Sequence, residues 1–194
     1  MPTHSIDYLT THEVARLLQV SPGAVLTWID QGTLPAFRTP GGHRRVVKST
    51  LARFVRDHGM PLPRELGVSR LLIVDDEPAF LRSAQRLLRS ATPGLEIATA
   101  TTAIDALLKV GTFRPDAVLL DAYMPGMDGV EVCKRLHSSP QTENIVIVAI
   151  TGKPSAELEK DFKKAGASAL LVKPLEAEEL TEALGISHAS MKER

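Results

Sequence analysis

Five polar residues that are far apart in the sequence each stand at the end of a short apolar run typical of a buried strand. These residues are Asp75, Asp76, Asp121, Thr151 and Lys173. In an open parallel α/β sheet, ligands bind beyond the carboxyl ends of the strands, so we expect the five side chains to converge in one pocket. Three neighbouring carboxylates would attract a hard divalent cation such as Mg²⁺. A lysine and a hydroxyl beside that cation would suit a phosphoryl group.

Alternating strand and helix patterns supply the elements that would position these residues. Five strand patterns and five helix patterns predict a doubly wound parallel sheet, an α/β fold with the flavodoxin-like strand order 2-1-3-4-5. The predicted strands are Arg70–Val74, Leu95–Thr99, Asp116–Leu120, Ile145–Ile150 and Ala169–Val172. The predicted helices are Pro78–Arg89, Ala103–Val110, Gly129–His137, Ser155–Ala165 and Glu176–Leu184.

A different pattern precedes residue 59. Thr10 and Glu13 have the spacing of a capping box, which predicts the start of a helix. Ser21 followed by Pro22 predicts a second helix start, and two helices joined by a tight turn are a helix-turn-helix signature. The predicted elements are helices over Glu13–Leu18, from Ser21 to near Gly32 and over Thr50–Arg56, and a hairpin of strands Leu34–Arg38 and Arg44–Val47.

The 194 residues of the chain suffice for two small domains. Gly59, Pro61, Pro63 and Gly67 would interrupt any helix, and they predict a short, semi-rigid linker between the domains. We therefore expect a first domain over residues 1–58, a linker over 59–68, a second domain over 69–186 and a C-terminal tail over 187–194.

Charge and composition distinguish the two parts and narrow the class of protein. Up to residue 68 there are eight Lys or Arg against five Asp or Glu, hence +3, and the remainder has fifteen against eighteen, hence −3. No apolar run approaches the roughly 20 residues that cross a bilayer, and no secretory signal pattern opens the chain. The single cysteine, Cys133, fits a reducing compartment. We expect a cytoplasmic protein, without membrane partners, whose two parts bind different molecules.

The second part resembles the receiver domain of two-component response regulators, the CheY-like family, over about Ser69–Gly185. Each motif is weak alone, but their order and their places at strand ends make a strong signal together. The motifs are Val74-Asp75-Asp76-Glu77, Leu120-Asp121, Met124-Pro125-Gly126-Met127-Asp128-Gly129, Ile150-Thr151 and Lys173-Pro174. The resemblance implies a switch that a sensor histidine kinase phosphorylates, and not an enzyme that turns over a substrate of its own.

The resemblance also assigns the phosphoryl chemistry to three residues. Asp121 would be the phosphoacceptor, since a carboxylate can attack phosphorus and form an aspartyl phosphate. Thr151 would donate its hydroxyl to the phosphoryl group, and Lys173 would pair with one of its oxygens. The peptide bond between Lys173 and Pro174 is expected to be cis.

A set of oxygen ligands for Mg²⁺ follows from the same resemblance. Asp76 and Asp121 would bind the ion directly, as would the backbone carbonyl of Tyr123. Asp75 would act through a bound water. Mg²⁺ prefers few protein ligands together with several waters, which agrees with this small set.

Leu170 departs from the family pattern. Receivers usually carry Tyr or Phe three residues before the lysine, as a switch that follows the hydroxyl residue inward. With leucine at that position, the site chemistry is retained but the aromatic movement is not available. We expect activation to signal through another part of the family's output face, or more weakly.

Residues from about Tyr8 to Asp57 resemble the winged helix-turn-helix of the MerR/excisionase superfamily. The resemblance implies that the second helix enters the major groove of duplex DNA and that the hairpin, a wing, reaches phosphates or the adjoining minor groove. The residues that carry it are Leu9-Thr10-Thr11-His12-Glu13-Val14-Ala15, Val20-Ser21, Trp28-Ile29, Gly32-Thr33-Leu34-Pro35 and Pro40-Gly41-Gly42-His43-Arg44-Arg45.

The candidate DNA contacts fall into two groups with different chemistry. The recognition helix would offer small side chains that read few base edges, whereas the wing would supply phosphate affinity. The helix candidates are Ser21, Gly23, Ala24 and Thr27, and the wing candidates are Arg38, His43, Arg44 and Arg45. We expect modest sequence specificity, with Trp28 in the core and no zinc site among the histidines.

More than one function remains open at this point. The first is a DNA-binding response regulator that, when phosphorylated, forms a homodimer on paired half-sites, with RNA polymerase as a further candidate partner. The second is a phosphorelay adaptor whose N-terminal domain binds a protein instead of DNA. A receiver that is not phosphorylated is a third, for which Leu170 leaves some room. A self-contained phosphohydrolase has little support, because no substrate pocket is predicted beyond the acidic site.

Overall fold

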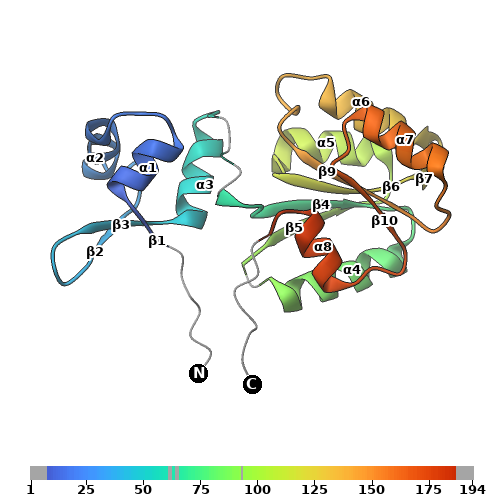
Figure 1. Ribbon diagram of the computed structural model, residues 1–194, viewed down its shortest axis with the longest axis horizontal. Helices are drawn as coiled ribbons and strands as arrows, with labels where there is room; N and C mark the ends of the chain where they lie inside the picture. The colour runs from blue at the N-terminus through green and yellow to red at the C-terminus, as the bar shows by residue number, and fades with distance from the viewer. Residues whose placement is uncertain (1–7, 61–62, 64–65, 93, 187–194) are drawn as a thin grey trace. The chain divides into compact units, whose positions relative to one another are not determined.

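The structure is a computed structural model that describes residues 8–60, 63, 66–92 and 94–186. The chain divides into two compact units, Met1–Gly67 and Val68–Arg194 (Figure 1). Parts of the predicted linker, residues 61–62 and 64–65, lie outside the described residues, as does the predicted tail over 187–194. The proposed domain boundaries themselves remain predictions.

The first unit combines three helices with a small antiparallel sheet. Its strands occur in the order β1-β3-β2, so β3 is central. The helices are α1 (Thr11–Leu17), α2 (Pro22–Asp30) and α3 (Lys48–Asp57), and the strands are β1 (Tyr8–Thr10), β2 (Phe37–Arg38) and β3 (Arg44–Val47). This confirms the predicted helix-turn-helix unit with a hairpin.

The predicted two-stranded hairpin is in fact the larger part of a three-stranded sheet. β1 pairs antiparallel with β3, and the Tyr8 ring lies edge-on to the Phe37 ring at a centroid distance of 4.7 Å. A three-residue strand that runs directly into a capping box leaves no separable pattern in the sequence. The first hairpin strand is also shorter than predicted: it begins at Phe37, and Leu34 lies before it, completely buried in the core of the unit.

The predicted capping box at the start of α1 is confirmed. The Glu13 backbone N–H donates to the Thr10 hydroxyl at 3.2 Å, and the Thr10 backbone N–H donates to the Glu13 carboxylate at 2.7 Å. The hydrogen bond from the Thr10 backbone is the main reason that the pKa of Glu13 is lowered. Because Thr10 is the N-cap and Glu13 is the third residue of the helix, α1 begins at Thr11, two residues earlier than predicted.

Loss of this cap gives a testable stability effect. We expect Thr10→Ala to lower the free energy of unfolding of the first unit by about 1 kcal/mol, because the Glu13 N–H loses its acceptor. Urea unfolding followed by circular dichroism would measure the change. Ser49→Ala in α3, an exposed position whose hydroxyl makes no hydrogen bond among the described residues, is the matched control. Equal loss in both variants would contradict a role for the cap.

Apolar side chains of the three helices and of β1 and β3 meet in one core. Val14 of α1, Val25 of α2 and Leu51 of α3 are completely buried in it. Trp28 packs against this core with its ring centroid 5.0 Å from that of Phe54, which confirms the prediction that Trp28 has a packing role.

The second unit is built on a five-stranded parallel sheet. The strands occur in the spatial order β10-β9-β6-β4-β5. Counted along this unit, that order is 5-4-3-1-2, which is the predicted 2-1-3-4-5 sheet read from its other edge. The strands are β4 (Arg70–Val74), β5 (Glu96–Ala100), β6 (Ala117–Asp121), β9 (Val146–Thr151) and β10 (Ala169–Val172).

Helices cover both faces of this sheet (Figure 1). Alternation along β4 sends Leu71 and Ile73 into one core and Leu72 and Val74 into the other, so the central strands are apolar on both sides. The first core is covered by α4 (Pro78–Ala91) and α8 (Ala177–Ala183). The second is covered by α5 (Ala103–Phe113), α6 (Gly129–His137) and α7 (Ala156–Ala165).

Three predicted strands are displaced by one residue in a way that matters for function. β5, β6 and β9 each begin and end one residue later than predicted, whereas β4 and β10 match. The polar residues Asp121 and Thr151 are therefore the last residues of β6 and β9, and not the first residues of the following loops. A short antiparallel pair, β7 (Tyr123–Met124) and β8 (Met127–Asp128), follows β6 and was not predicted.

Candidate functional site

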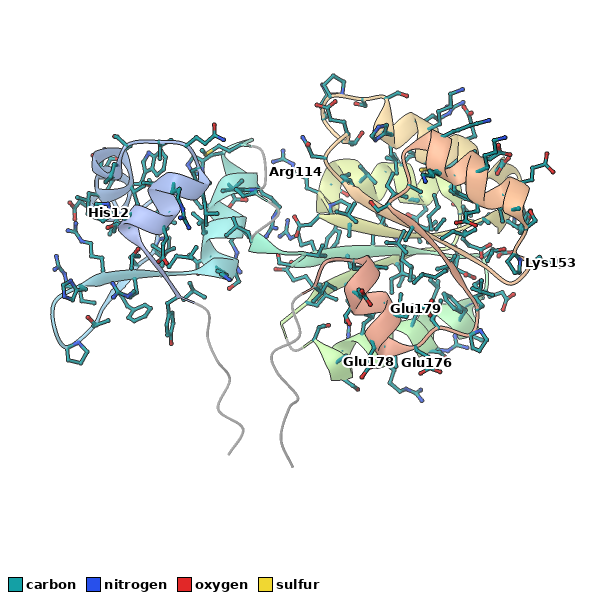
Figure 2. The ribbon with its side chains drawn as sticks, in the orientation of Figure 1. His12, Arg114, Lys153, Glu176, Glu178 and Glu179 are labelled. Atoms are coloured by element: carbon teal, nitrogen blue, oxygen red, sulfur yellow. The ribbon has the colours of Figure 1, made fainter. Side chains whose placement is uncertain are left out.

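The predicted site residues meet at the carboxyl edge of the parallel sheet. Asp121 and Thr151 end the neighbouring strands β6 and β9, while Asp75 directly follows β4 and Lys173 directly follows β10. Since β4, β6, β9 and β10 are successive neighbours in the sheet, four segments that are far apart in sequence reach one edge together. Figure 2 shows Lys153, on the loop after β9, at the same edge.

The ammonium group of Lys173 lies between two buried carboxylates. Its Nζ donates to Asp75 Oδ2 at 2.6 Å and is 2.8 Å from Asp121 Oδ1. Asp75 is completely buried and Asp121 is 5% exposed, so both depend on protein groups for their hydrogen bonds. The remaining oxygens are also occupied, because Asp75 Oδ1 accepts from the Glu77 N–H at 2.8 Å and Asp121 Oδ2 from the Tyr123 N–H at 3.0 Å.

Burial and charge act in opposite directions on these groups. Burial raises the pKa of Asp121 above its ordinary value, although the hydrogen bond and charge of Lys173 oppose the rise. For Lys173, burial lowers the pKa, but its hydrogen bonds to Asp121 and Asp75 outweigh burial and leave the pKa raised. The lysine is therefore held as a protonated, charged partner beside the carboxylate that is the predicted phosphoacceptor.

The neighbouring Thr151 and Pro174 are placed as expected. Thr151 is completely buried, and its hydroxyl accepts a hydrogen bond from the Lys153 N–H at 3.0 Å. Its predicted donation to a phosphoryl group remains a prediction. The Lys173–Pro174 peptide bond is cis, as the family resemblance implied. Leu170 is half-buried and packs against the core on the α5, α6 and α7 side of the sheet.

Two contacts of the site were missed by sequence reasoning. A Cβ on Gly129 would lie 2.5 Å from the Asp121 carbonyl oxygen, so the start of α6 approaches the end of β6 as closely as glycine allows. The Phe80 ring centroid lies 4.2 Å from Lys173 Nζ. Gly129 is the last residue of the Met-Pro-Gly-Met-Asp-Gly motif, and this motif could have indicated the close approach. Phe80 lies in the predicted helix Pro78–Arg89, whose pattern is that of any amphipathic helix, so nothing in the sequence marks it as a site residue.

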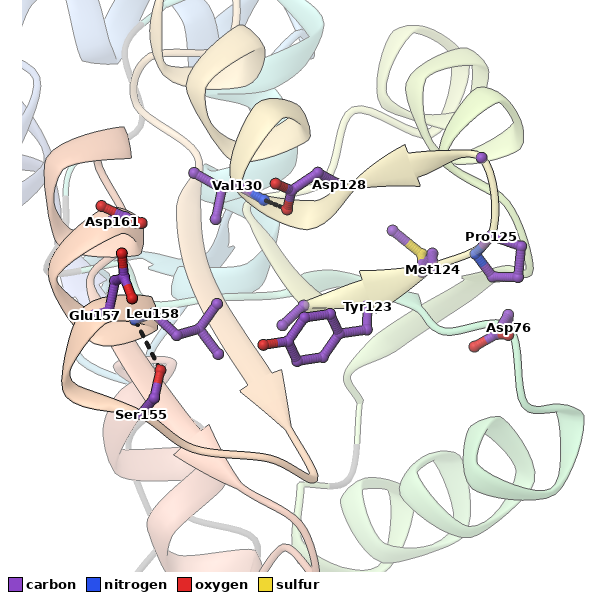
Figure 3. A pocket seen from close by; sticks show the side chains of 12 residues that line it. Asp76, Tyr123, Met124, Pro125, Asp128, Val130, Ser155, Glu157, Leu158 and Asp161 are labelled. Carbon is purple, nitrogen blue, oxygen red and sulfur yellow. Dashed lines mark hydrogen bonds between the residues drawn. The ribbon is translucent and has the colours of Figure 1, made fainter.

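A cleft of about 830 Å³ opens beside the site. In Figure 3 the Tyr123 ring lies in this cleft, with Asp76 on one side and residues of α7 on the other. Asp128 also lines it, and its carboxylate caps α6 by accepting from the Val130 N–H at 3.0 Å. The rest of the lining is Ala122, Met124, Pro125, Gly126, Val130, Ser155, Glu157, Leu158 and Asp161.

The expected convergence of three carboxylates is not seen. Asp75 and Asp121 share the Lys173 ammonium, whereas Asp76 is exposed and lines the cleft. Within the described ranges, no group of three or more His, Cys, Asp or Glu side chains is arranged to hold a metal ion. Lys173 supplies positive charge to Asp75 and Asp121, whereas the sequence led us to expect that a divalent cation would supply it. In type, the carboxylate and carbonyl oxygens at this edge still fit the ligands that Mg²⁺ prefers.

The predicted recognition helix α2 presents few long polar groups. Ser21 caps it by accepting from the Ala24 N–H at 3.2 Å, and the Thr27 hydroxyl donates to the Gly23 carbonyl at 2.9 Å. Ser21, Gly23 and Thr27 are exposed, whereas Ala24 is half-buried. The structure thus places three of the four candidates on the surface of the helix.

The four cationic candidates of the wing, defined here as residues 37–47, differ in their surroundings. Arg38 and His43 are exposed, and the Arg38 guanidinium donates to a carbonyl within the wing at 3.1 Å. Arg44 forms an ion pair with Asp30 at the end of α2, and Arg45 donates to the Arg44 carbonyl at 3.0 Å. Arg44 therefore ties the wing to the recognition helix, a role that the sequence did not suggest.

Comparison with known proteins identifies the two units. The family described as response regulator receiver domain matches residues 71–185, and the family described as helix-turn-helix domain matches residues 8–59. The chain belongs to the response regulator receiver family and carries an N-terminal helix-turn-helix domain. Receivers of this family generally use Mg²⁺ for phosphorylation.

Curated relatives resemble the receiver portion. Response regulator MprA of Mycobacterium sp. (strain KMS) is 37% identical over 111 residues, which are 57% of this chain and 46% of the relative. Protein-glutamate methylesterase/protein-glutamine glutaminase 5 of Myxococcus xanthus is 42% identical over 106 residues, 54% of this chain and 30% of that protein. The chain thus spans less than half the length of these relatives.

Solved structures confirm the fold of this unit. The signal receiver domain of a DNA binding response regulator protein (merR) from Colwellia psychrerythraea 34H is 33% identical, with a TM-score of 0.56, covering 58% of this chain and 92% of that one. Chemotaxis protein CheY4 of Vibrio cholerae is 32% identical, with a TM-score of 0.56, covering 60% of this chain and 95% of that one.

Among the described residues, no helix combines the length and apolar character that a membrane crossing requires.

Proposed function

We propose that this protein is a DNA-binding response regulator in which phosphorylation of Asp121 controls the N-terminal helix-turn-helix domain. The supporting observation is the buried arrangement of Asp75, Lys173 and Asp121 at the carboxyl edge of the receiver sheet. A protonated lysine beside a nucleophilic carboxylate suits the transfer of an anionic group. The signal source is a sensor histidine kinase, and the protein acts as a cytoplasmic switch and not as an enzyme with its own substrate.

The proposed transfer forms one bond to phosphorus and breaks another. One carboxylate oxygen of Asp121 forms a bond to phosphorus, and the bond from phosphorus to the donor breaks, with its electron pair remaining on the donor. The donor atom is a histidine nitrogen in the kinase or a carboxylate oxygen in acetyl phosphate. Lys173 pairs with a phosphoryl oxygen, and Thr151 donates its hydroxyl to another. Hydrolysis later returns the Asp121 carboxylate and releases inorganic phosphate.

Magnesium would be held by oxygen atoms of the same edge. Asp76 and Asp121 would bind the ion directly together with the backbone carbonyl of Tyr123, and Asp75 would act through a water. When bound, the ion supplies positive charge that offsets the phosphoryl oxygens during transfer. The Asp76 side chain lines the open cleft beside Tyr123, where it is accessible for this purpose.

Binding of duplex DNA is assigned to the first unit. The exposed face of α2 would enter the major groove, and the exposed Arg38 and His43 of the wing would contact phosphates. One small domain would bind a single site weakly. A homodimer of the phosphorylated protein would occupy paired half-sites with greater avidity, and RNA polymerase is a candidate partner at the promoter.

A single experiment tests the switch. The full chain is incubated with Mg²⁺ and acetyl phosphate, and intact mass, oligomer size and retention on duplex DNA are measured on the same samples. We expect a gain of about 80 Da, the mass of one phosphoryl group, together with a change in DNA retention. Absence of the adduct with both acetyl phosphate and kinase donors would overturn the proposal, as would an adduct that leaves DNA binding unchanged.

The salt dependence of DNA binding tests the wing separately. We expect Arg38→Ala to weaken binding about equally for different sequences, and to reduce the slope of log K against log salt by about one. Arg53→Ala, which removes an exposed arginine of α3 outside the predicted contacts, is the matched control. If both variants kept the full slope, the wing would not contact phosphates and the adaptor alternative would gain support.

A further inference from the structure

The ammonium of Lys173 has an aromatic neighbour in addition to its two carboxylate partners. The Phe80 ring centroid is 4.2 Å from Nζ, within the range of a cation–π contact. Phe80 is the third residue of α4 and is half-buried, where it packs against the core beneath α4 and α8. The helix that follows the acidic loop thus brings an aromatic face to the predicted phosphoryl-binding lysine.

We propose that Phe80 is a positioning residue for phosphoryl transfer, because its ring holds the Lys173 ammonium in place beside Asp121. This inference rests on the proposed function of Asp121 as phosphoacceptor. Phe80 takes no part in bond making, and it acts only through the lysine.

The contact suits a cation that must change partners. In the resting state Nζ lies 2.6 Å from Asp75 Oδ2 and 2.8 Å from Asp121 Oδ1. When Asp121 accepts the phosphoryl group, Lys173 must move toward a phosphoryl oxygen. Attraction to the face of a ring has no donor or acceptor geometry to break, so the ammonium can shift while it stays beside Phe80.

Substitutions of Phe80 that keep or remove the aromatic ring distinguish a cation–π role from simple packing. Leucine would retain an apolar side chain but has no ring quadrupole to attract a cation, whereas tyrosine retains it. We therefore expect Phe80→Leu to slow phosphorylation by acetyl phosphate about fivefold, and Phe80→Tyr to stay near the wild-type rate. The measurement is the initial rate of adduct formation, followed by intact mass at fixed Mg²⁺ and acetyl phosphate.

A second aromatic residue of the same domain provides the matched control. The Phe113 ring lies 5.4 Å from the Arg70 guanidinium carbon, and Arg70 begins β4 at the amino edge of the sheet, away from the site. Phe113→Leu removes a comparable cation–π contact and should leave the phosphorylation rate unchanged. Should Phe80→Leu fail to fold, Phe80→Met supplies another non-aromatic side chain for the same comparison.

The possible failures can be told apart. If the wild-type chain gains no adduct, both the proposed function and this inference are wrong. If the wild type is phosphorylated and the leucine or methionine variant reacts at the same rate, only the role of Phe80 is overturned. A rate that falls equally in Phe80→Leu and Phe80→Tyr would assign Phe80 to packing and would also overturn the proposal.

Discussion

The Asp121→Asn variant is expected to gain no phosphoryl adduct under conditions in which the wild-type chain gains one. An amide nitrogen and oxygen replace the carboxylate with little change in size, but the nucleophilic oxygen anion is lost. Lys173 keeps its hydrogen bond to Asp75, so the pocket retains its charged partner. Intact mass after incubation with Mg²⁺ and acetyl phosphate measures the effect.

A matched aspartate tests whether this loss is specific to the site. Asp161 is a half-buried residue of α7 on the wall of the cleft, and Asp161→Asn should be phosphorylated like the wild type. An adduct of undiminished yield on Asp121→Asn would place the acceptor elsewhere and contradict the assignment.

The same substitution should also change the pH dependence of stability. Burial raises the pKa of Asp121 from its ordinary value of 3.8, so ionisation of this group costs folding free energy. This cost is absent below pH 3.8, where the Asp121 carboxyl is protonated in both the folded and the unfolded chain. It is complete once the pH exceeds the raised pKa of the folded chain. We expect Asp121→Asn to be more stable than the wild type near neutral pH, and the difference to shrink in acid. Urea unfolding of both proteins between acid and neutral pH measures which of them is more stable at each pH.

Gly129→Ala is expected to damage both the fold and the site. The added Cβ would lie 2.5 Å from the Asp121 carbonyl oxygen and 3.0 Å from Ala122 Cα, and both neighbours are backbone atoms that cannot rotate away. Overpacking of this kind costs about 1–3 kcal/mol. Relief of the clash must move the backbone of Asp121, so we also expect the rate of phosphorylation to fall by at least about tenfold. Urea unfolding and adduct formation would measure the two effects.

Another helical glycine provides the control for Gly129→Ala. A Cβ on Gly111, in the last part of α5, meets nothing within 4 Å, and this glycine is exposed. Gly111→Ala should therefore stabilise the protein by about 0.5–1 kcal/mol through a better helix propensity. Tolerance of alanine at both positions would show that α6 does not need its close approach to β6.

The sequence carried enough information for the strand order and for the main site residues. Apolar runs that end in Asp75, Asp121 and Thr151 determine both the sheet and its functional edge, because parallel neighbours end on the same side. The bounds of β6 and β9 were one residue too early, since a polar terminal residue was taken for a loop. Sequence patterns record polarity, and the last residue of a strand can be polar where its side chain meets a site.

Contacts between distant segments could not be predicted in the same way. The ion pair of Arg44 with Asp30 and the ring contact of Phe80 with Lys173 join residues whose own local patterns are ordinary. The exposed position of Asp76 was also not apparent, because adjacent aspartates point in different directions after a strand. Each of these depends on tertiary geometry that no local spacing determines.

The lysine seated between Asp75 and Asp121 means that the receiver carries its own counter-ion. Part of the negative charge of the two buried carboxylates is then offset by the protein itself, before any divalent ion binds. On the proposed function, we expect a receiver without Mg²⁺ to stay folded but unphosphorylated.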